Sequence, residues 1–307
     1  MTTDYVLRRA AQSAILLFLV TIVVFLILQL VPGDPATVML GGQATLNEIE
    51  LLRKQMGLDR PLVEQYLRYL AGILHGDLGL SIRAGIPVLD YIGQRLPASL
   101  ALASVAFALV LVVGIPAGVL ASVKSGTVVD HVVMTMAILG QAVPAFWLGL
   151  LMIILFAVRL RVLPPFGFGS SAHLVMPALT LALLQTGLVA RVTRSEMLGV
   201  LSQDYIRTAR AKGLLETRVI AKHALRNALI PLITVLGIQF GTLVGGAVVT
   251  ETVFGWPGIG SLVVNAVYQR DYPVVQGVVL LLAGAFVMIN FVVDSLYAAL
   301  DPRVVYV

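Results

Sequence analysis

Apolar residues occur in six long runs along this chain, separated by polar segments. The runs cover residues 10–31, 97–123, 131–158, 173–190, 229–250 and 273–293, and none contains Asp, Glu, Lys or Arg. A helix needs roughly 20 apolar residues to cross a bilayer core about 30 Å thick. We therefore predict an all-α integral membrane protein with six transmembrane helices.

The polar segments divide the predicted protein into three parts. Residues 1–31 form the N-terminus and the first span, 32–96 a segment outside the membrane, and 97–307 a five-helix core with a polar loop at 191–228. Inside the outer segment, Thr45 and Glu48 have the spacing of a capping box, and Gly57 is a helix stop. A second helix is predicted from Pro61, a favoured first-turn residue. This segment is either a simple loop packed on the span ends or a contact surface for an external partner.

The distribution of basic residues predicts the orientation of the chain. With the N-terminus in the cytoplasm, 12 of the 21 Lys and Arg residues and seven of the 16 Asp and Glu residues lie inside. The net charge of +5 then lies wholly on the cytoplasmic side, as expected from the enrichment of Lys and Arg in cytoplasmic loops. An even number of spans returns the C-terminus to the cytoplasm. The charge therefore indicates topology, and we expect no nucleic-acid partner.

Composition and motifs exclude most catalytic functions. Charged residues make up 12% of the chain, against about 25% in soluble domains. The absence of cysteine excludes disulfides and thiol chemistry. No phosphate-binding loop appears, since Val123 stands where residues 118–125 would need the second glycine. No metalloprotease or hydrolase motif occurs, and the four histidines are scattered. We predict no metal site, no bound cofactor and no enzymatic activity, so any energy must come from a partner.

Polar side chains inside the predicted spans are mostly uncharged amides. A carrier driven by protons or sodium usually buries ionisable residues near the membrane midplane, and no such set appears. Each amide is either hydrogen-bonded in the protein interior or exposed to a conduction path. The candidates for a substrate path or outer gate are Gln141, Gln185, Gln239, Glu251, Trp256 and Asp271.

Two sets of glycines are spaced by four residues and so share a helix face. They are Gly114 and Gly118 in the second run, and Gly237, Gly241 and Gly245 in the fifth. Small residues at this spacing let helix backbones approach closely in lipid. We predict helix packing for these positions, either within the chain, against a second subunit or along a conduction path.

A basic stretch interrupts the apolar pattern between the fourth and fifth runs. Residues 204–231 read DYIRTARAKGLLETRVIAKHALRNALIP. A short helix is predicted over 203–212, with Ser202 as N-cap and Gly213 as stop. A second helix begins near Glu216 and carries a predicted basic stripe: Arg218, Lys222 and Arg226. The stretch is either a docking element for a soluble partner or a loop facing solvent and lipid headgroups.

Gly213 and the pair Ile230-Pro231 have the spacing of the cytoplasmic EAA loop of ABC-importer permeases. Arg207, Thr208 and Ala209 stand where that loop has its Glu-Ala-Ala triplet, so only Ala209 matches the triplet. The segment RTARAKG (207–213) is, however, similar to the form of this loop in the dipeptide/oligopeptide branch. Six further segments resemble that branch in the same order: 30–35 (LVPGDP), 57–61 (GLDRP), 75–79 (HGDLG), 94–97 (QRLP), 251–260 (ETVFGWPGIG) and 270–273 (RDYP). The long segment after the first span resembles the B-type subunit of the pair.

The resemblance implies the type I ABC-importer permease fold in the cytoplasmic (inner) membrane. The implied partners are a second, C-type permease, two cytoplasmic ATPases that use ATP and Mg, an external solute-binding protein, membrane lipid and a peptide substrate. The implied ATPase-coupling residues are Asp204, Arg207, Thr208, Ala209, Arg210, Lys212 and Gly213. Ala209 and Gly213 are expected in an ATPase groove. The alternatives are import of nickel, glutathione or another small solute by the same machinery, and, from a different class, a passive channel.

Overall fold

The computed structural model describes residues 3–30, 35–40 and 44–300. These residues are mostly helical, joined by turns and loops, with one isolated antiparallel bridge between Leu80 and Pro87. The end of the first predicted span at 31, residues 31–34 of the LVPGDP segment, and Arg303 lie outside the described residues.

The described residues up to the end of the second membrane-length helix form five α-helices. They are α1 (Thr3–Leu30), α2 (Pro35–Leu40), α3 (Leu46–Met56), α4 (Leu62–Leu74) and α5 (Val88–Val123). The next elements are α6 (Val128–Ala142), α7 (Ala145–Met152), the π-helix η1 (Ile153–Arg159), α8 (Ser171–Leu201), α9 (Asp204–Ala211) and α10 (Glu216–Arg218). The chain ends with a second π-helix, η2 (Val219–Leu225), then α11 (Arg226–Gly246), α12 (Val248–Val253), α13 (Ile259–Gln269) and α14 (Tyr272–Leu300).

Five helical stretches of the described residues are long and apolar enough to cross a membrane, and a bent pair of helices makes a sixth. The bent pair is α6 with α7 and η1, which turn by 101° between Ala142 and Ala145. Pro144 lies at this break, directly before α7. Proline has no backbone N–H and its ring clashes with the preceding turn, so it interrupts a continuous helix. The third predicted run, 131–158, is therefore two helices rather than one, and α8 continues beyond 190 to Leu201.

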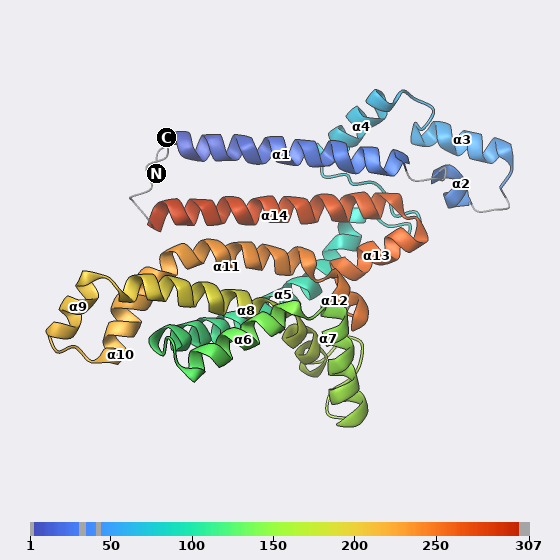
Figure 1. Cartoon of the computed structure of the whole chain (residues 1–307). Coiled ribbons are helices and arrows are strands. Elements are labelled where there is room, and N and C mark those ends of the chain that lie inside the picture. The colour runs from blue at the N-terminus through green and yellow to red at the C-terminus, as the bar shows by residue number, and fades with distance from the viewer. Residues whose placement is uncertain (1–2, 31–34, 41–43, 301–307) are drawn as a thin grey trace.

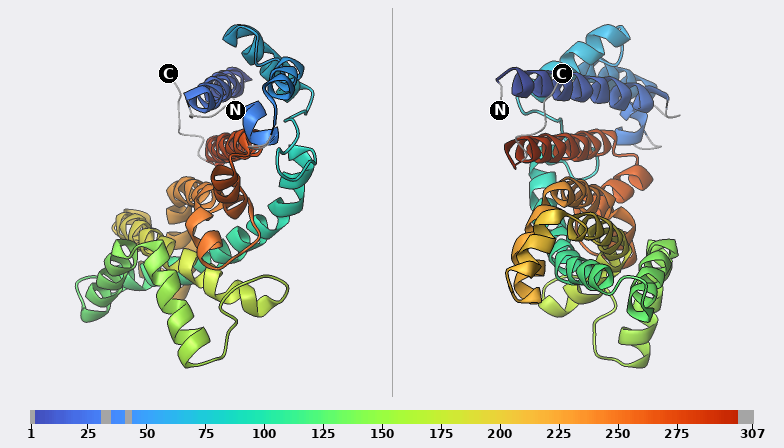
Figure 2. Two further views of the ribbon diagram at one scale, coloured as in Figure 1. Left: turned by 90° about the vertical axis from the view of Figure 1, so that its right-hand side faces the viewer. Right: turned by 60° about the vertical axis from the view of Figure 1, so that its left-hand side comes forward.

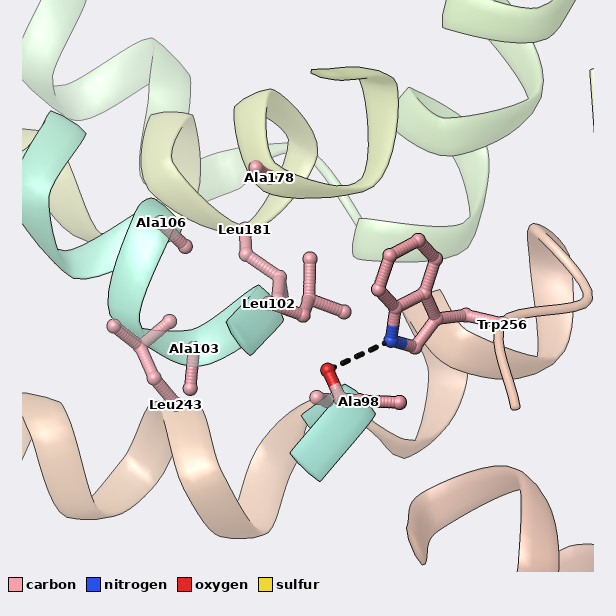
Figure 3. Packing of buried hydrophobic residues seen from close by; sticks show 9 residues of the cluster. Ala98, Leu102, Ala103, Ala106, Ala178, Leu181, Leu243 and Trp256 are labelled. Carbon is pink, nitrogen blue, oxygen red and sulfur yellow. Dashed lines mark hydrogen bonds between the residues drawn. The ribbon is translucent and has the colours of Figure 1, made fainter. Parts of the chain in front are cut away.

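The long helices pack side by side in the order α1, α14, α11, α8, with α5 and α6 both against α8 (Figures 1 and 2). At the centre, small residues of α5 and α8 interlock with α11 and with the Trp256 side chain (Figure 3). Trp256 donates its indole N–H to the Ala98 carbonyl at 2.9 Å. This core connects three elements that are far apart in the sequence.

The predicted glycine faces pack mainly within the chain. A Cβ on Gly114 would meet Val189 of α8 at 3.1 Å. On α11, Gly237 faces Val293 and Gly241 faces Phe286, both on α14. Gly245 has nothing within 4 Å of such a Cβ, so this one position is open.

The outer segment folds as the capping signals predict. Thr45 and Glu48 form the capping box of α3, and Gly57 ends that helix in the left-handed conformation, with φ of 69°. These hydrogen bonds from Thr45 lower the pKa of Glu48. Helix α4 packs on α1, where the Tyr66 and Thr21 hydroxyls are 2.8 Å apart and Phe25 meets Tyr66 edge to face.

Candidate functional site

The polar stretch after α8 folds back on itself as a short hairpin of helices α9, α10 and η2. We call residues 202–225 the polar hairpin. It lies at the end of the helix bundle where α1 begins and α14 ends (Figure 1). The N-cap of α9 is Gln203 rather than Ser202, because the Ser202 hydroxyl instead donates to the Gly199 carbonyl at 2.8 Å.

One face of α9 is buried against the chain's own helices. Ile206 is fully buried and Ala209 is 7% exposed. They belong to a cluster that we call the hairpin cluster, formed by Met197, Ile206, Ala209, Val219, Ala224 and Ala228. Ala209 therefore faces the interior of this chain, which differs from the expectation that it lies in a partner's groove. The cluster joins α9 to the end of α8 and the start of α11.

The other face of α9 is exposed and polar. The exposed residues of α9 and of the turn after it include all the remaining predicted coupling residues: Asp204, Arg207, Thr208, Arg210, Lys212 and Gly213. The Arg210 guanidinium donates to both carboxylate oxygens of Glu216, at 2.7 and 3.1 Å. This ion pair raises the pKa of Arg210 and ties the two arms of the hairpin together.

Gly213 forms the turn of the hairpin. Its φ is +75°, and a Cβ there would meet nothing within 4 Å. Glycine adopts this left-handed conformation without the steric cost that a Cβ brings. A side chain at this position would therefore point away from the chain, into open space.

The predicted basic stripe runs through the π-helix η2. The wider turn of a π-helix still leaves residues four apart close to one face. Lys222 and Arg226 line a surface cavity together with His223, and Arg218 is not among its lining residues. The predicted stripe therefore stays a prediction for Arg218.

At the opposite end of α11, Glu251 is buried and holds the loop between α12 and α13. Its exposed fraction is 1%. The Ser99 hydroxyl donates to Oε1 at 2.6 Å, and the Ser261 backbone N–H donates to Oε2 at 3.0 Å. Ser99 Oγ also accepts from the Ile259 N–H at 2.8 Å. The carboxylate thereby fastens the start of α13 to α5.

Asp271 fastens the start of α14 to the outer segment in a similar way. It accepts from the Ser81 hydroxyl at 2.5 Å and from the backbone N–H groups of Ile82 and Arg83 at 3.0 and 3.2 Å. The residue is 2% exposed. Asp271, Glu251 and Trp256 are thus all buried within the chain, and the structure shows no exposure of any of them to a path.

The amides predicted in the spans connect neighbouring helices. The Gln239 amide on α11 donates to the Gln185 side-chain oxygen on α8. Gln141 near the end of α6 accepts from Arg191 of α8 at 2.7 Å. Gln185 and Gln239 therefore lie together between α8 and α11, whereas Gln141 lies apart from them.

Two family descriptions match this chain over nearly its whole length. Residues 114–306 match the binding-protein-dependent transport system inner membrane component, and residues 2–103 match the N-terminal part of such membrane components. This chain belongs to that family. It is therefore a multi-pass inner-membrane permease subunit of an ABC importer of the peptide/nickel type, without catalytic activity of its own.

Curated relatives match this permease along their full length. It is 45% identical over 303 residues to the glutathione transport system permease protein GsiC of Escherichia coli (strain K12), covering 99% of each chain. The protein of the same name from Shigella boydii serotype 4 (strain Sb227) is 44% identical over 303 residues, again with 99% of each chain covered.

Solved structures show the same fold. The permease superposes on a chain of the inward-facing MetNI methionine ABC transporter with a TM-score of 0.60 and 22% identity, covering 69% of this chain and 97% of that one. An amino acid ABC transporter crystallised with histidines gives a TM-score of 0.50 and 13% identity, with 70% and 94% covered. The permease therefore has the type I ABC-importer fold, as predicted.

Several residues that organise the permease were not predicted from the sequence. Ser99 and Ser261 hold Glu251, and Ser81 holds Asp271, although all three serines look ordinary in the sequence. Asp130 is 2% exposed and forms two hydrogen bonds of 2.6 Å with the Arg194 guanidinium. In the sequence, the only sign of this pair is that Asp130 directly precedes the apolar run 131–158 and Arg194 follows the apolar run 173–190.

We expect Asp130 and Arg194 to stabilise the packing of α6 on α8 as a unit. In a double-mutant cycle with Asp130→Ala and Arg194→Ala, the coupling free energy should be about 1–3 kcal/mol, because each single variant leaves the other charge partly buried and unpaired. Denaturant titration of the permease in detergent measures it. The exposed contact between Arg191 and Gln141 is the matched control, with an expected coupling below about 0.5 kcal/mol. Equal coupling in both cycles would contradict a special role for Asp130.

Proposed function

We propose that this permease forms one half of the translocation path of an ATP-driven importer of short peptides, with glutathione, itself a tripeptide, as the first candidate. The full-length similarity to permeases named for glutathione transport supports this substrate class. The segments that resemble the dipeptide/oligopeptide branch support it as well. A second, C-type permease would supply the other half of the path, and an external solute-binding protein would deliver the substrate.

The polar hairpin is the proposed docking element for one of two cytoplasmic ATPases, which would use ATP and Mg. Both termini and the hairpin would then face the cytoplasm, in agreement with the excess of Lys and Arg on that side. The observation that carries this proposal is the two-faced α9. Its exposed polar face is available to a partner, and its buried face is packed in the hairpin cluster.

The packing of α8 and α11 gives a physical route from the hairpin to the outer end. The two helices are joined in the hairpin cluster, again by the Gln185–Gln239 hydrogen bond, and again in the core under Trp256. Beyond that core, the chain continues through α12 to the loop that Glu251 holds. Displacement of α9 by an ATPase would therefore tilt α8 and α11 together and move the outer loop, as alternating access requires.

ATP hydrolysis by the reconstituted transporter tests the substrate class. The permease is co-expressed with the products of neighbouring genes, placed in liposomes and assayed with its binding protein empty or loaded with glutathione or a dipeptide. We expect loaded binding protein to stimulate hydrolysis and uptake. Hydrolysis that ignores both ligands would contradict a peptide substrate but keep an ATP-driven importer. Failure to recover any ATPase partner would contradict the docking role of the hairpin and favour a passive channel.

We expect Gly213→Trp to abolish coupling between ATP hydrolysis and uptake. The indole would project from the hairpin turn into the docking space, and uptake should fall by at least about tenfold, equivalent to about 1.4 kcal/mol of lost interaction. Liposome uptake of labelled substrate measures this effect, and membrane insertion should be unchanged.

Gly126→Trp is the matched control for the hairpin variant. Gly126 has φ of +76° and, like Gly213, nothing within 4 Å of a Cβ. Both variants therefore carry the same backbone strain, and only one alters the hairpin. Uptake should stay within about twofold of the wild type for Gly126→Trp, a difference below about 0.5 kcal/mol. Equal losses in both variants would show that strain, not docking, causes the effect.

A further inference from the structure

A cavity of about 540 Å³ opens on the surface between the polar hairpin and the start of α11. Its walls come from α9, η2 and the first two turns of α11. It lies where the charged part of the chain ends and the uncharged run from 229 begins. In a membrane, this transition corresponds to the boundary between headgroups and acyl chains.

Three basic side chains converge on one part of the cavity: Lys222, His223 and Arg226. No Asp or Glu is among the lining residues. In the part of the chain that the structure describes, neither Lys222 nor Arg226 forms an ion pair, whereas Arg210 of the same hairpin is paired with Glu216. The cavity therefore presents positive charge that no described residue of this chain neutralises.

Neutral polar groups form a second part of the cavity wall. The Asn227 amide donates to the Tyr205 hydroxyl oxygen at 3.0 Å and to the His223 carbonyl at 2.8 Å. These bonds hold Tyr205 of α9 against the start of α11. The Tyr205 O–H is left as a donor for an acceptor in the cavity.

The remaining wall is apolar, formed by Leu229, Ile230 and Ile233. These side chains continue the cavity toward the uncharged part of α11. A ligand that fits both halves carries a negative headgroup and a hydrocarbon chain. A soluble phosphate would match only the basic half and would leave the apolar wall uncovered.

We propose that this cavity binds the phosphate headgroup of an anionic phospholipid, with the start of one acyl chain on the apolar wall. Phosphate pairs well with Lys and Arg donors, and basic side chains at the membrane surface attract anionic lipids. Because Tyr205 precedes Ile206 of the hairpin cluster, the bound headgroup would bridge α9 and α11. Binding here requires only that α11 enters the membrane, so it is independent of the transported substrate.

Native mass spectrometry of the full permease, purified with its co-expressed partners, tests this site. The probes are phosphatidylglycerol, phosphatidylcholine of the same chain length, and inorganic phosphate. We expect phosphatidylglycerol to be retained in preference to phosphatidylcholine. The preference should fall about tenfold in the variant Lys222→Gln/Arg226→Gln, since each basic residue contributes to attraction of an anionic surface. The charge-keeping variant Lys222→Arg/Arg226→Lys should retain the preference.

The control removes two charges elsewhere. Arg8 and Lys124 are exposed and do not line the cavity, so Arg8→Gln/Lys124→Gln should leave lipid retention unchanged. Equal loss in this control would overturn a specific site. Retention of inorganic phosphate as strong as that of phosphatidylglycerol would overturn the lipid in favour of a soluble ligand. Lipid binding by the isolated permease that disappears in the assembled transporter would show that a partner protein covers the cavity, and would also overturn the proposal.

Discussion

Replacing Glu251 by alanine should destabilise the permease by about 3 kcal/mol. The substitution leaves the buried Ser99 hydroxyl and Ser261 N–H without their acceptor, and each unpaired donor costs about 1–3 kcal/mol. It also leaves a cavity, because Gly258 and Gly260 pack directly against the carboxylate. The loss should appear as a drop of roughly 5 °C or more in the apparent unfolding temperature in detergent. Amide hydrogen exchange at Ile259 and Ser261 should accelerate as well, since both belong to the network.

Glu50→Ala is the control for loss of a carboxylate. Glu50 forms an exposed ion pair with Lys54 at 3.0 Å, and exposed pairs of this kind contribute about 0.5 kcal/mol or less. If Glu251→Ala were as mild as Glu50→Ala, the carboxylate would not be what fastens α13 to α5. The proposed movement of the outer loop would then need another anchor.

Sequence patterns predicted the long helices well because their cause is local and strong. A run of about 20 uncharged apolar residues has few alternatives to a membrane-spanning helix. The capping box of Thr45 and Glu48 and the stop at Gly57 were predicted for the same reason, since each needs only neighbouring residues. The bend at Pro144 was the exception. Proline was visible in the sequence, but a proline inside a span can kink a helix slightly or break it, and packing decides which.

The candidate site was less predictable because its decisive contacts are distant in the sequence. Ser99 and Glu251 are 152 positions apart, and nothing near Ser99 marks it as the partner of a buried acid. Ala209 shows a second limit. Its helical spacing with Ile206 correctly predicts a shared face, but the same pattern fits burial against a partner or against the chain itself. The π-helix at 219–225 shows a third limit of sequence analysis, because the assumption of 3.6 residues per turn does not hold there.

Gly118→Ala should disrupt the packing of α5 on α8, at a cost of about 2–3 kcal/mol for overpacking. A Cβ at this position would lie 2.5 Å from the Ala190 carbonyl oxygen and 2.6 Å from the Thr193 Cβ. Neither atom can move without shifting α8, because one is backbone and the other is fixed to it. The unfolding temperature and the yield of folded protein after gel filtration measure the loss.

Gly93→Ala in the same helix isolates the steric effect. It makes the same chemical change, but a Cβ on Gly93 would meet nothing within 4 Å. Alanine is the better helix former by up to about 1 kcal/mol, so this variant should be neutral or slightly stabilised. A similar loss in both variants would indicate that α5 needs glycine for bending rather than for contact with α8. A loss confined to Gly118→Ala would show that α5 and α8 are held at backbone contact distance.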